Sequence, residues 1–330
     1  MTLLCPVRRG DTGGLTNRPT MHDTISRRRA AKLIGATAAS ALLPIGTSRI
    51  YGADESQVMR SVPSTGEKLP VIGLGSAVTF DVRPGSPQLK PLGEVLALFV
   101  KHAGKVIDSS PMYGNAEGVI GDLAAKSHLR NSLFIATKVW TKGKQEGIAQ
   151  MQRSLERFQT RTIDLMQVHN LADVENQMGS LREWKAKGRI RYTGITYSED
   201  SGFGEVERVM RIQKPDFVQI NYSLVDRGAA QRILPLAQEL RMGVIINRPF
   251  GGGGVLKVIS AKPLPPWAAE FDCHSWAQFL LKWIAAHPAV TCVIPATNNP
   301  QHLEDNMAAG IGRLPDAKTR QRMSSLFVGF

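Results

Sequence analysis

From residue 54 onward, short runs of β-branched and other apolar residues alternate with longer segments in which apolar residues recur at helical spacing. This alternation is typical of parallel βα units, in which a helix leads from each strand to the next. The pattern predicts a hairpin around residues 61–69, followed by eight strands. The predicted strands cover residues 71–75, 105–109, 133–137, 163–168, 192–196, 217–221, 243–247 and 291–295.

Eight strands within about 230 residues predict a (β/α)8 TIM barrel, with the short N-terminal hairpin closing its bottom. A doubly wound sheet is the alternative, and it is disfavoured because Gly73-Leu74-Gly75 lacks the third glycine of a dinucleotide fingerprint and leads into no helix. Helical spacing is clearest over residues 146–157, 174–187, 229–240 and 276–287. Glycines just after predicted helices indicate left-handed C-caps at Gly104, Gly188 and Gly243.

The first 53 residues form an extension that we separate from the barrel of residues 54–330. Ser26, the pair Arg27-Arg28 and Lys32 precede an uncharged, weakly polar run over residues 33–46. That run has 14 residues, too few for a membrane-spanning helix but suited to the apolar region of a secretory signal. The pattern resembles a bacterial twin-arginine export signal.

This resemblance predicts export to the periplasm or beyond, with the twin-arginine machinery as a partner. Ala30 and Ala31 replace the usual larger apolar pair, and Met21 is a plausible start. Tyr51-Gly52-Ala53 is a poor cleavage site because its first residue is bulky. An uncleaved form, held at the membrane through this segment alone, therefore stays open, as does a cytoplasmic protein if the signal does not function.

Composition narrows the classes of function. The 330 residues are 42% hydrophobic, enough to bury a large core. Residues 1–53 hold eight Lys and Arg against two Asp and so carry +6 of the net charge of +13, which leaves +7 for the other 277 residues. The remainder has no basic stripe interleaved with aromatic residues, so no nucleic-acid partner is predicted. A mildly basic cleft for a phosphorylated cofactor suits the remaining charge better.

Cysteine and histidine positions predict neither a disulfide framework nor a metal site. The three cysteines, Cys5, Cys273 and Cys292, have no C-x-x-C spacing. A bridge between Cys273 and Cys292 stays open if the compartment is oxidising. Asp272, Cys273 and His274 are adjacent, and adjacent residues rarely point at one ion, so we interpret them as a loop before a helix.

Four polar residues follow three successive predicted strands: Asp108 and Tyr113, then Lys138, then His169. In a parallel barrel these strand ends share one face, so the four side chains are expected to converge. The set suits proton transfer to a carbonyl, with tyrosine as the acid, an ammonium that lowers its pKa, and an imidazole that orients the substrate. Asp108 would keep Lys138 charged. Each residue alone has a structural explanation, so the prediction depends on the set and its order.

The sequence around these four residues, and several motifs further along the chain, resemble the aldo-keto reductases over roughly residues 59–310. The most specific is VIDSSPMYG, because Asp and Tyr five residues apart after the second strand are that family's signature. The resemblance implies NADPH-linked reduction of an aldehyde or ketone by the tetrad Asp108, Tyr113, Lys138 and His169, with Tyr113 as general acid. The other motifs are IATKVW, DLMQVHN, KAKGRIRYTGITYS, DFVQINYSL and IPATNNPQHLEDN.

The resemblance also implies a set of residues for the cofactor. Thr196 and Gln219 are expected to hold the carboxamide, although Tyr197 replaces the family's usual asparagine. Asn247 stands where a tyrosine commonly stacks on the nicotinamide, so Arg248 or Phe250 would have to replace it or stacking would be absent. The expected cofactor-binding residues are Thr196, Gln219, Arg248, Phe250, Gly251, Thr297, His302 and Asn306.

The glycine run and the residues near the 2′-phosphate each allow two interpretations. Residues 251–254 are all glycine and would either wrap the pyrophosphate through backbone amides or form a flexible loop. Ala296, Thr297 and His302 replace the family's Lys-Ser and Arg that grip the 2′-phosphate, while Asn306 is kept. NADP(H) is favoured by the resemblance, and NAD(H) stays possible. Trp140 and Met112 either line an apolar substrate pocket or pack in the core.

A second class of function is a catalytically weak or inactive protein of the same fold that senses redox state or binds a partner. The replaced stacking residue and an exported location, where free NADPH is scarce, motivate it, and the intact tetrad argues against it. A metal-dependent hydrolase would need several His and acidic ligands at strand ends. Only Asp108 and His169 qualify, so no metal is predicted.

Overall fold

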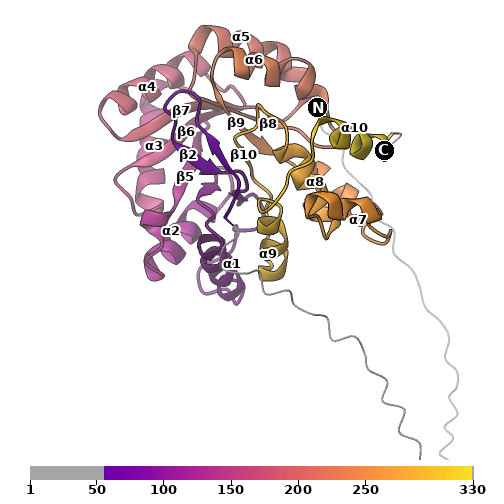
Figure 1. Ribbon diagram of the computed structural model, residues 1–330. Coiled ribbons are helices and arrows are strands. Elements are labelled where there is room, and N and C mark those ends of the chain that lie inside the picture. Colours follow the sequence, from indigo (N-terminus) through magenta and orange to yellow (C-terminus); the bar gives the residue numbers. More distant parts are fainter. Residues whose placement is uncertain (1–55, 329–330) are drawn as a thin grey trace, which may run out of the picture. The chain divides into compact units, whose positions relative to one another are not determined.

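Parallel strands surrounded by helices form the core of the computed structural model, which describes residues 56–328 (Figure 1). The predicted extension over residues 1–53 and its export signal lie outside the described residues. Within the described part, eight parallel strands pair in chain order from β3 to β10. They are β3 (Leu74–Gly75), β4 (Val106–Asp108), β5 (Phe134–Val139), β6 (Ile163–His169), β7 (Ile190–Thr196), β8 (Phe217–Asn221), β9 (Gly243–Asn247) and β10 (Cys292–Val293).

Single parallel bridges join the first strand region to the last, Ile72 to Val293 and Gly75 to Ala296, so that the sheet nearly closes on itself. The backbone N–H of Gly73 donates to the carbonyl of Val293 at 2.8 Å across this seam. The predicted (β/α)8 barrel is therefore confirmed. All carboxyl ends of its strands lie at one rim, where such barrels carry their sites.

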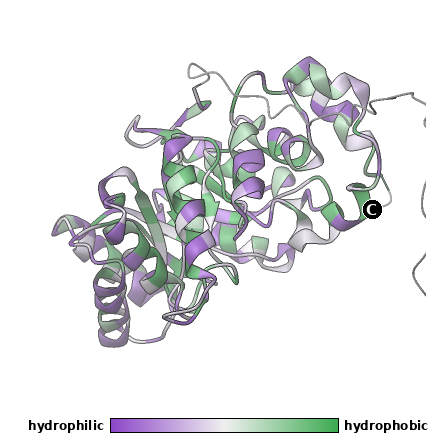
Figure 2. Cartoon of the chain, turned by 90° about the horizontal axis from the view of Figure 1, so that it is seen from below, coloured by the Kyte–Doolittle hydropathy of each residue, from purple (hydrophilic) through white to green (hydrophobic). Residues whose placement is uncertain are grey.

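The strands are buried on both faces, and the helices bury one. Every residue of β5 and β6 is buried, as expected for a parallel sheet covered by helices. Figure 2 shows hydrophobic strands at the centre and hydrophilic residues concentrated on the surrounding helices. The helices are α1 (Leu89–Lys101), α2 (Ala116–Lys126), α3 (Lys144–Arg157), α4 (Val174–Ala186), α5 (Phe203–Gln213), α6 (Ile233–Glu239), α7 (Gly254–Ile259), α8 (Trp276–Ala285), α9 (Pro300–Ala308) and α10 (Ala317–Ser325).

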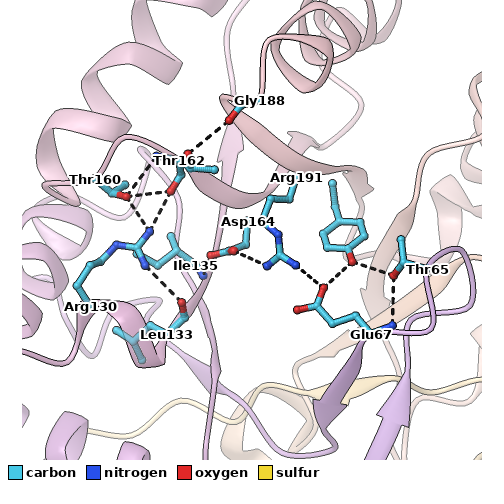
Figure 3. Close-up of polar contacts among 11 residues, drawn as sticks. Thr65, Glu67, Arg130, Leu133, Ile135, Thr160, Thr162, Asp164, Gly188 and Arg191 are labelled. Atoms are coloured by element: carbon cyan, nitrogen blue, oxygen red, sulfur yellow. Dashed lines mark hydrogen bonds and ion pairs between the residues drawn. The ribbon is translucent and has the colours of Figure 1, made fainter.

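The predicted hairpin is present and consists of β1 (Met59–Ser61) and β2 (Lys68–Pro70), which pair antiparallel. Its turn reaches a polar network at the amino ends of the barrel strands (Figure 3). Tyr192 donates its hydroxyl to Glu67 Oε2 at 2.5 Å, and Thr65 Oγ1 lies 2.8 Å from the same hydroxyl. Arg191 bridges Glu67 at 2.6 Å and Asp164 at 2.8 Å. This network, which we call the base network, fixes the hairpin to the barrel.

The left-handed C-cap prediction is right at Gly188, whose φ is +67°, and wrong at the other two glycines. Ala103 (φ +59°) and Arg241 (φ +55°) adopt the left-handed conformation after α1 and α6. Gly104 and Gly243 are glycine because of space: a Cβ would lie 2.2 Å from the Phe99 ring in one case and 2.4 Å from the Phe217 ring in the other. At these two positions close packing, not backbone conformation, excludes a side chain.

Cys273 and Cys292 are both buried free thiols, so the bridge left open between them does not form in this structure. Burial raises the pKa of the Cys273 thiol to about 12, which keeps it protonated. No helix between residues 56 and 328 has the length and apolar character needed to cross a membrane.

Candidate active site

Three neighbouring strands bring the predicted tetrad together. Asp108 ends β4, Lys138 lies in β5 and His169 ends β6, while Tyr113 follows β4 in the loop before α2. Lys138 Nζ donates to Asp108 Oδ2 and to the Ser109 carbonyl, both at 2.6 Å. It also lies 5.1 Å from the centre of the Tyr113 ring. Lys138 is 1% exposed and Asp108 3%, so the ion pair is sheltered from water.

Asp108 receives two more donors on its second oxygen. Gln167 Nε2 lies 3.2 Å from Oδ1 and Gln219 Nε2 lies 2.9 Å from it. Burial alone would lower the pKa of Lys138, but the charge and hydrogen bond of Asp108, together with the charges of Tyr113 and Glu117, outweigh it, and the pKa is raised. The ammonium therefore stays charged, as the sequence-based role of Lys138 requires.

His169 is held at its inner nitrogen. Ser110 Oγ lies 3.0 Å from His169 Nδ1 and accepts the Met112 amide at 3.3 Å. The His169 ring meets Tyr113 edge to face, with ring centres 6.1 Å apart, and lies 6.4 Å from Trp140. Burial, and secondly the positive charge of Lys138, lowers the pKa of His169 to about 3. The imidazole is therefore neutral at physiological pH.

Sequence reasoning missed Ser110 and Gln167. Gln167 had one available signal, because it is a polar residue two positions before His169 in a strand that is buried throughout. Side chains two apart in a strand point to the same side, so Gln167 shares the face of His169. Ser110 lies inside the VIDSSPMYG motif, but nothing in its spacing indicates a histidine 59 residues away.

A cavity of about 590 Å³ opens above the tetrad at the carboxyl ends of the strands. Tyr113 and His169 lie on its wall, and Lys138 lies behind them. Four of the eight predicted cofactor residues line it. They are Thr196, Gln219, Arg248 and Phe250. Met112 also lines the cavity, while Trp140, 44% exposed, lies beside His169.

The lining offers hydrogen-bonding atoms that the protein leaves unused. Ser76 Oγ and Asn247 Oδ1 are buried without a protein partner, and both residues line the cavity. Thr196 donates to Gln219 Oε1 at 3.0 Å, so the two predicted carboxamide partners are bonded to each other. Arg248 reaches the Ser198 carbonyl at 3.3 Å. Unpaired buried polar atoms fit a ligand with several donors and acceptors, such as a dinucleotide.

The glycine run forms one side of this cavity. Gly251, Gly252 and Gly253 all have positive φ, between +55° and +88°. A Cβ on Gly252 or Gly253 would meet no atom within 4 Å, and both line the cavity. The backbone here is bare and open to the cavity, which lets a phosphate group approach closely.

The other predicted cofactor residues do not line the cavity. Gly251 lies next to the lining glycines. Thr297 Oγ1 accepts the Asn299 amide at 3.1 Å in the turn before α9. His302 is exposed on α9, and Asn306 is 4% exposed on the same helix. Their cofactor roles stay predictions. Between residues 56 and 328, no group of three His, Cys, Asp or Glu side chains could hold a metal ion.

Most of the described chain matches a known protein family. The model of the aldo/keto reductase family matches residues 71–323. The chain is similar to the methylglyoxal reductase YeaE of Escherichia coli, with 28% identity over 247 residues that cover 73% of this chain and 85% of that protein. It is also similar to the probable aldo-keto reductase 1 of Glycine max, with 26% identity over 263 residues that cover 67% and 75%.

Solved structures share the fold. An aldo/keto reductase from Klebsiella pneumoniae, crystallised with NADP and acetate, superposes with a TM-score of 0.71 at 23% identity, covering 82% of this chain and 95% of that one. The holo form of aldo-keto reductase AKR11C1 from Bacillus halodurans gives a TM-score of 0.68 at 20% identity, covering 82% and 96%.

Proposed function

The chain belongs to the aldo/keto reductase family, and we propose that it reduces an aldehyde or ketone to the alcohol at the tetrad, with NADP(H) as cofactor. The observation that carries this proposal is the buried Lys138–Asp108 ion pair directly behind Tyr113, on the wall of a cavity with unused polar atoms. When bound, the reduced nicotinamide supplies a hydride to the carbonyl carbon.

Each tetrad residue has one task in this proposal. Tyr113 gives its hydroxyl proton to the carbonyl oxygen as that oxygen gains charge. The Lys138 ammonium, 5.1 Å from the Tyr113 ring centre, stabilises the phenolate that is left. Asp108 keeps Lys138 charged and in place. His169, neutral and beside Tyr113, donates a hydrogen bond that orients the carbonyl.

The same cavity would hold the nicotinamide part of the cofactor. Thr196 and Gln219 hold the carboxamide, with Asn247 Oδ1 as a further acceptor for its N–H groups. Arg248 or Phe250 covers the nicotinamide face in place of an aromatic residue at position 247. Backbone amides of residues 251–254 would take the pyrophosphate, while Thr297, His302 and Asn306, which do not line the cavity, are assigned to the cofactor by the family resemblance alone. NADP in the Klebsiella relative supports NADP(H) over NAD(H).

The test is NADPH oxidation with a panel of aldehydes and ketones that begins with methylglyoxal, the substrate for which the Escherichia coli relative is named. We expect Tyr113→Phe to lose about 100-fold or more in kcat while still binding NADPH, because only the acid is removed. Equal rates for both proteins would contradict the role of Tyr113. A parallel series with NADH measures the cofactor preference.

The alternative is a cofactor-binding sensor or partner-binding protein without significant turnover. Asn247 favours it, because the cavity has no aromatic residue at the position that usually covers the nicotinamide. This alternative predicts that wild type and Tyr113→Phe both bind NADPH and that neither oxidises it with any carbonyl of the panel.

We also propose that the protein is exported through the twin-arginine machinery, on the basis of Arg27-Arg28 and the run that follows them. Export of a folded protein would let it carry its cofactor across the membrane. Cell fractionation, with the N-terminus of the mature chain determined, tests this. Unprocessed protein found in the cytoplasm, and unchanged by an Arg27→Lys, Arg28→Lys double variant, would refute it.

A further inference from the structure

We propose that Ser110 is a positioning residue that sets the tautomer of His169, so that the ring nitrogen facing the cavity carries the proton. This inference deepens the proposed function and rests on it for its catalytic consequence. The tautomer itself is a property of the protein that can be measured without turnover.

The hydrogen bonds of Ser110 determine the direction of its contact with His169. Ser110 is fully buried, and its hydroxyl has one proton to donate and two positions that accept. One accepting position takes the Met112 amide at 3.3 Å. Across the described chain, His169 Nδ1, at 3.0 Å, is the one acceptor that this hydroxyl reaches. Leaving a buried hydroxyl proton unpaired is unfavourable, so the hydroxyl donates to Nδ1.

A nitrogen that accepts this bond carries no proton. His169 is neutral because burial holds its pKa far below the ordinary value, and a neutral imidazole has one proton on its two nitrogens. That proton is therefore on Nε2. Since Nδ1 is turned toward Ser110, Nε2 is the nitrogen left to face the cavity, where it donates to a carbonyl oxygen. The opposite tautomer would present a lone pair that repels this oxygen.

Nuclear magnetic resonance of the 15N-labelled protein with NADP+ bound tests the proposal, because the two imidazole tautomers have distinct nitrogen shifts. We expect the wild type to show a bare Nδ1 and a protonated Nε2 for His169. Ser110→Ala should lose this single pattern and about tenfold or more in kcat/KM for the carbonyl. Ser110→Thr, which keeps the hydroxyl, should retain the pattern and recover activity.

The matched control is Ser180→Ala, which removes another buried serine hydroxyl, one that donates to the Asn176 carbonyl within α4, away from the site. It should change neither the spectrum of His169 nor the rate. A protonated Nδ1 in the wild type, or an unchanged tautomer and rate in Ser110→Ala, would overturn the proposal. If Ser110→Ala does not fold, the wild-type and Ser110→Thr spectra still decide it. If the spectra agree but no carbonyl is reduced, the proposed function fails and the tautomer assignment stands.

Discussion

Replacing Glu67 with glutamine tests whether the base network stabilises the barrel. Glu67 lies in the hairpin turn and accepts from Tyr192 and Arg191 at 2.5 and 2.6 Å (Figure 3). Glutamine keeps an oxygen for the Tyr192 hydroxyl but loses the charge that pairs with Arg191. The change is therefore confined to one ion pair and to the strength of one hydrogen bond.

The size of the effect follows from exposure. A hydrogen bond to a buried charged group contributes about 1.5–3 kcal/mol, and an exposed ion pair contributes about 0–1 kcal/mol. The Glu67 side chain is 29% exposed and that of Arg191 44%, which places this pair between the two cases. We expect Glu67→Gln to lower the free energy of unfolding by about 1.5 kcal/mol, which corresponds to about 3 °C in Tm for a domain of this size.

Thermal unfolding followed by circular dichroism measures the change, and its pH dependence identifies the cause. Burial by itself would raise the pKa of Glu67, but Tyr192 and Arg191 outweigh it and the pKa is lowered. A lowered folded-state pKa means that the stabilisation is complete above the ordinary value of 4.5 and is lost as pH falls through the folded value. The difference in Tm between wild type and variant should therefore be full at about pH 7 and shrink toward zero in acid.

Glu205→Gln on α5 is the control, because it removes the charge from an exposed pair with Arg208 and should leave Tm unchanged. Equal losses in the two variants, or a difference for Glu67→Gln that persists in acid, would refute the reasoning. Activity per folded molecule should stay at the wild-type level, because Glu67 lies at the opposite end of the barrel from Tyr113.

Three further predictions concern the site. Val78 lines the cavity, and Val78→Gly should raise Tm by about 2 °C in thermal unfolding, because a β-branched residue at φ +65°, 88% exposed, is strained there; a lower Tm would contradict this. Lys138→Met should abolish turnover and cost about 3–5 kcal/mol in urea unfolding, because it leaves Asp108 buried and unpaired; adding Asp108→Asn should restore stability but not activity. The pH profile of kcat/KM should show no inflection near the ordinary histidine pKa, because burial lowers the pKa of His169 to about 3. An inflection near the ordinary value that disappears in His169→Gln would contradict this prediction.

The order of strands was predictable because each buried strand is an apolar run bounded by polar or glycine residues. The predicted ranges 217–221 and 243–247 coincide with β8 and β9. At the seam, β3 and β10 have two residues each where five were predicted. These two strands are short because the first and last strand regions of the barrel are joined only by single bridges. The local sequence pattern does not show how the first and last strands pair to close the barrel.

The tetrad was predictable for the same reason, since strand order alone places the ends of β4, β5 and β6 side by side. Ser110 and Gln167 were not, because their roles depend on which atoms they meet from strands far along the chain. The roles of the predicted cofactor residues around His302 depend on the paths of loops and on a bound ligand. The spacing of hydrophobic residues predicts neither.

The ring of donors around Asp108 links catalytic competence to complete folding. Lys138, Gln167 and Gln219 reach this carboxylate from β5, β6 and β8, so four strands must be in register before the charge is satisfied. A barrel with β5 displaced would enclose an uncompensated carboxylate, which is costly in an apolar interior, and one with β6 or β8 displaced would lose a hydrogen bond to it. The contacts that hold Lys138 behind Tyr113 therefore also favour the correct strand register. Barrels with displaced strands should be both less stable and inactive.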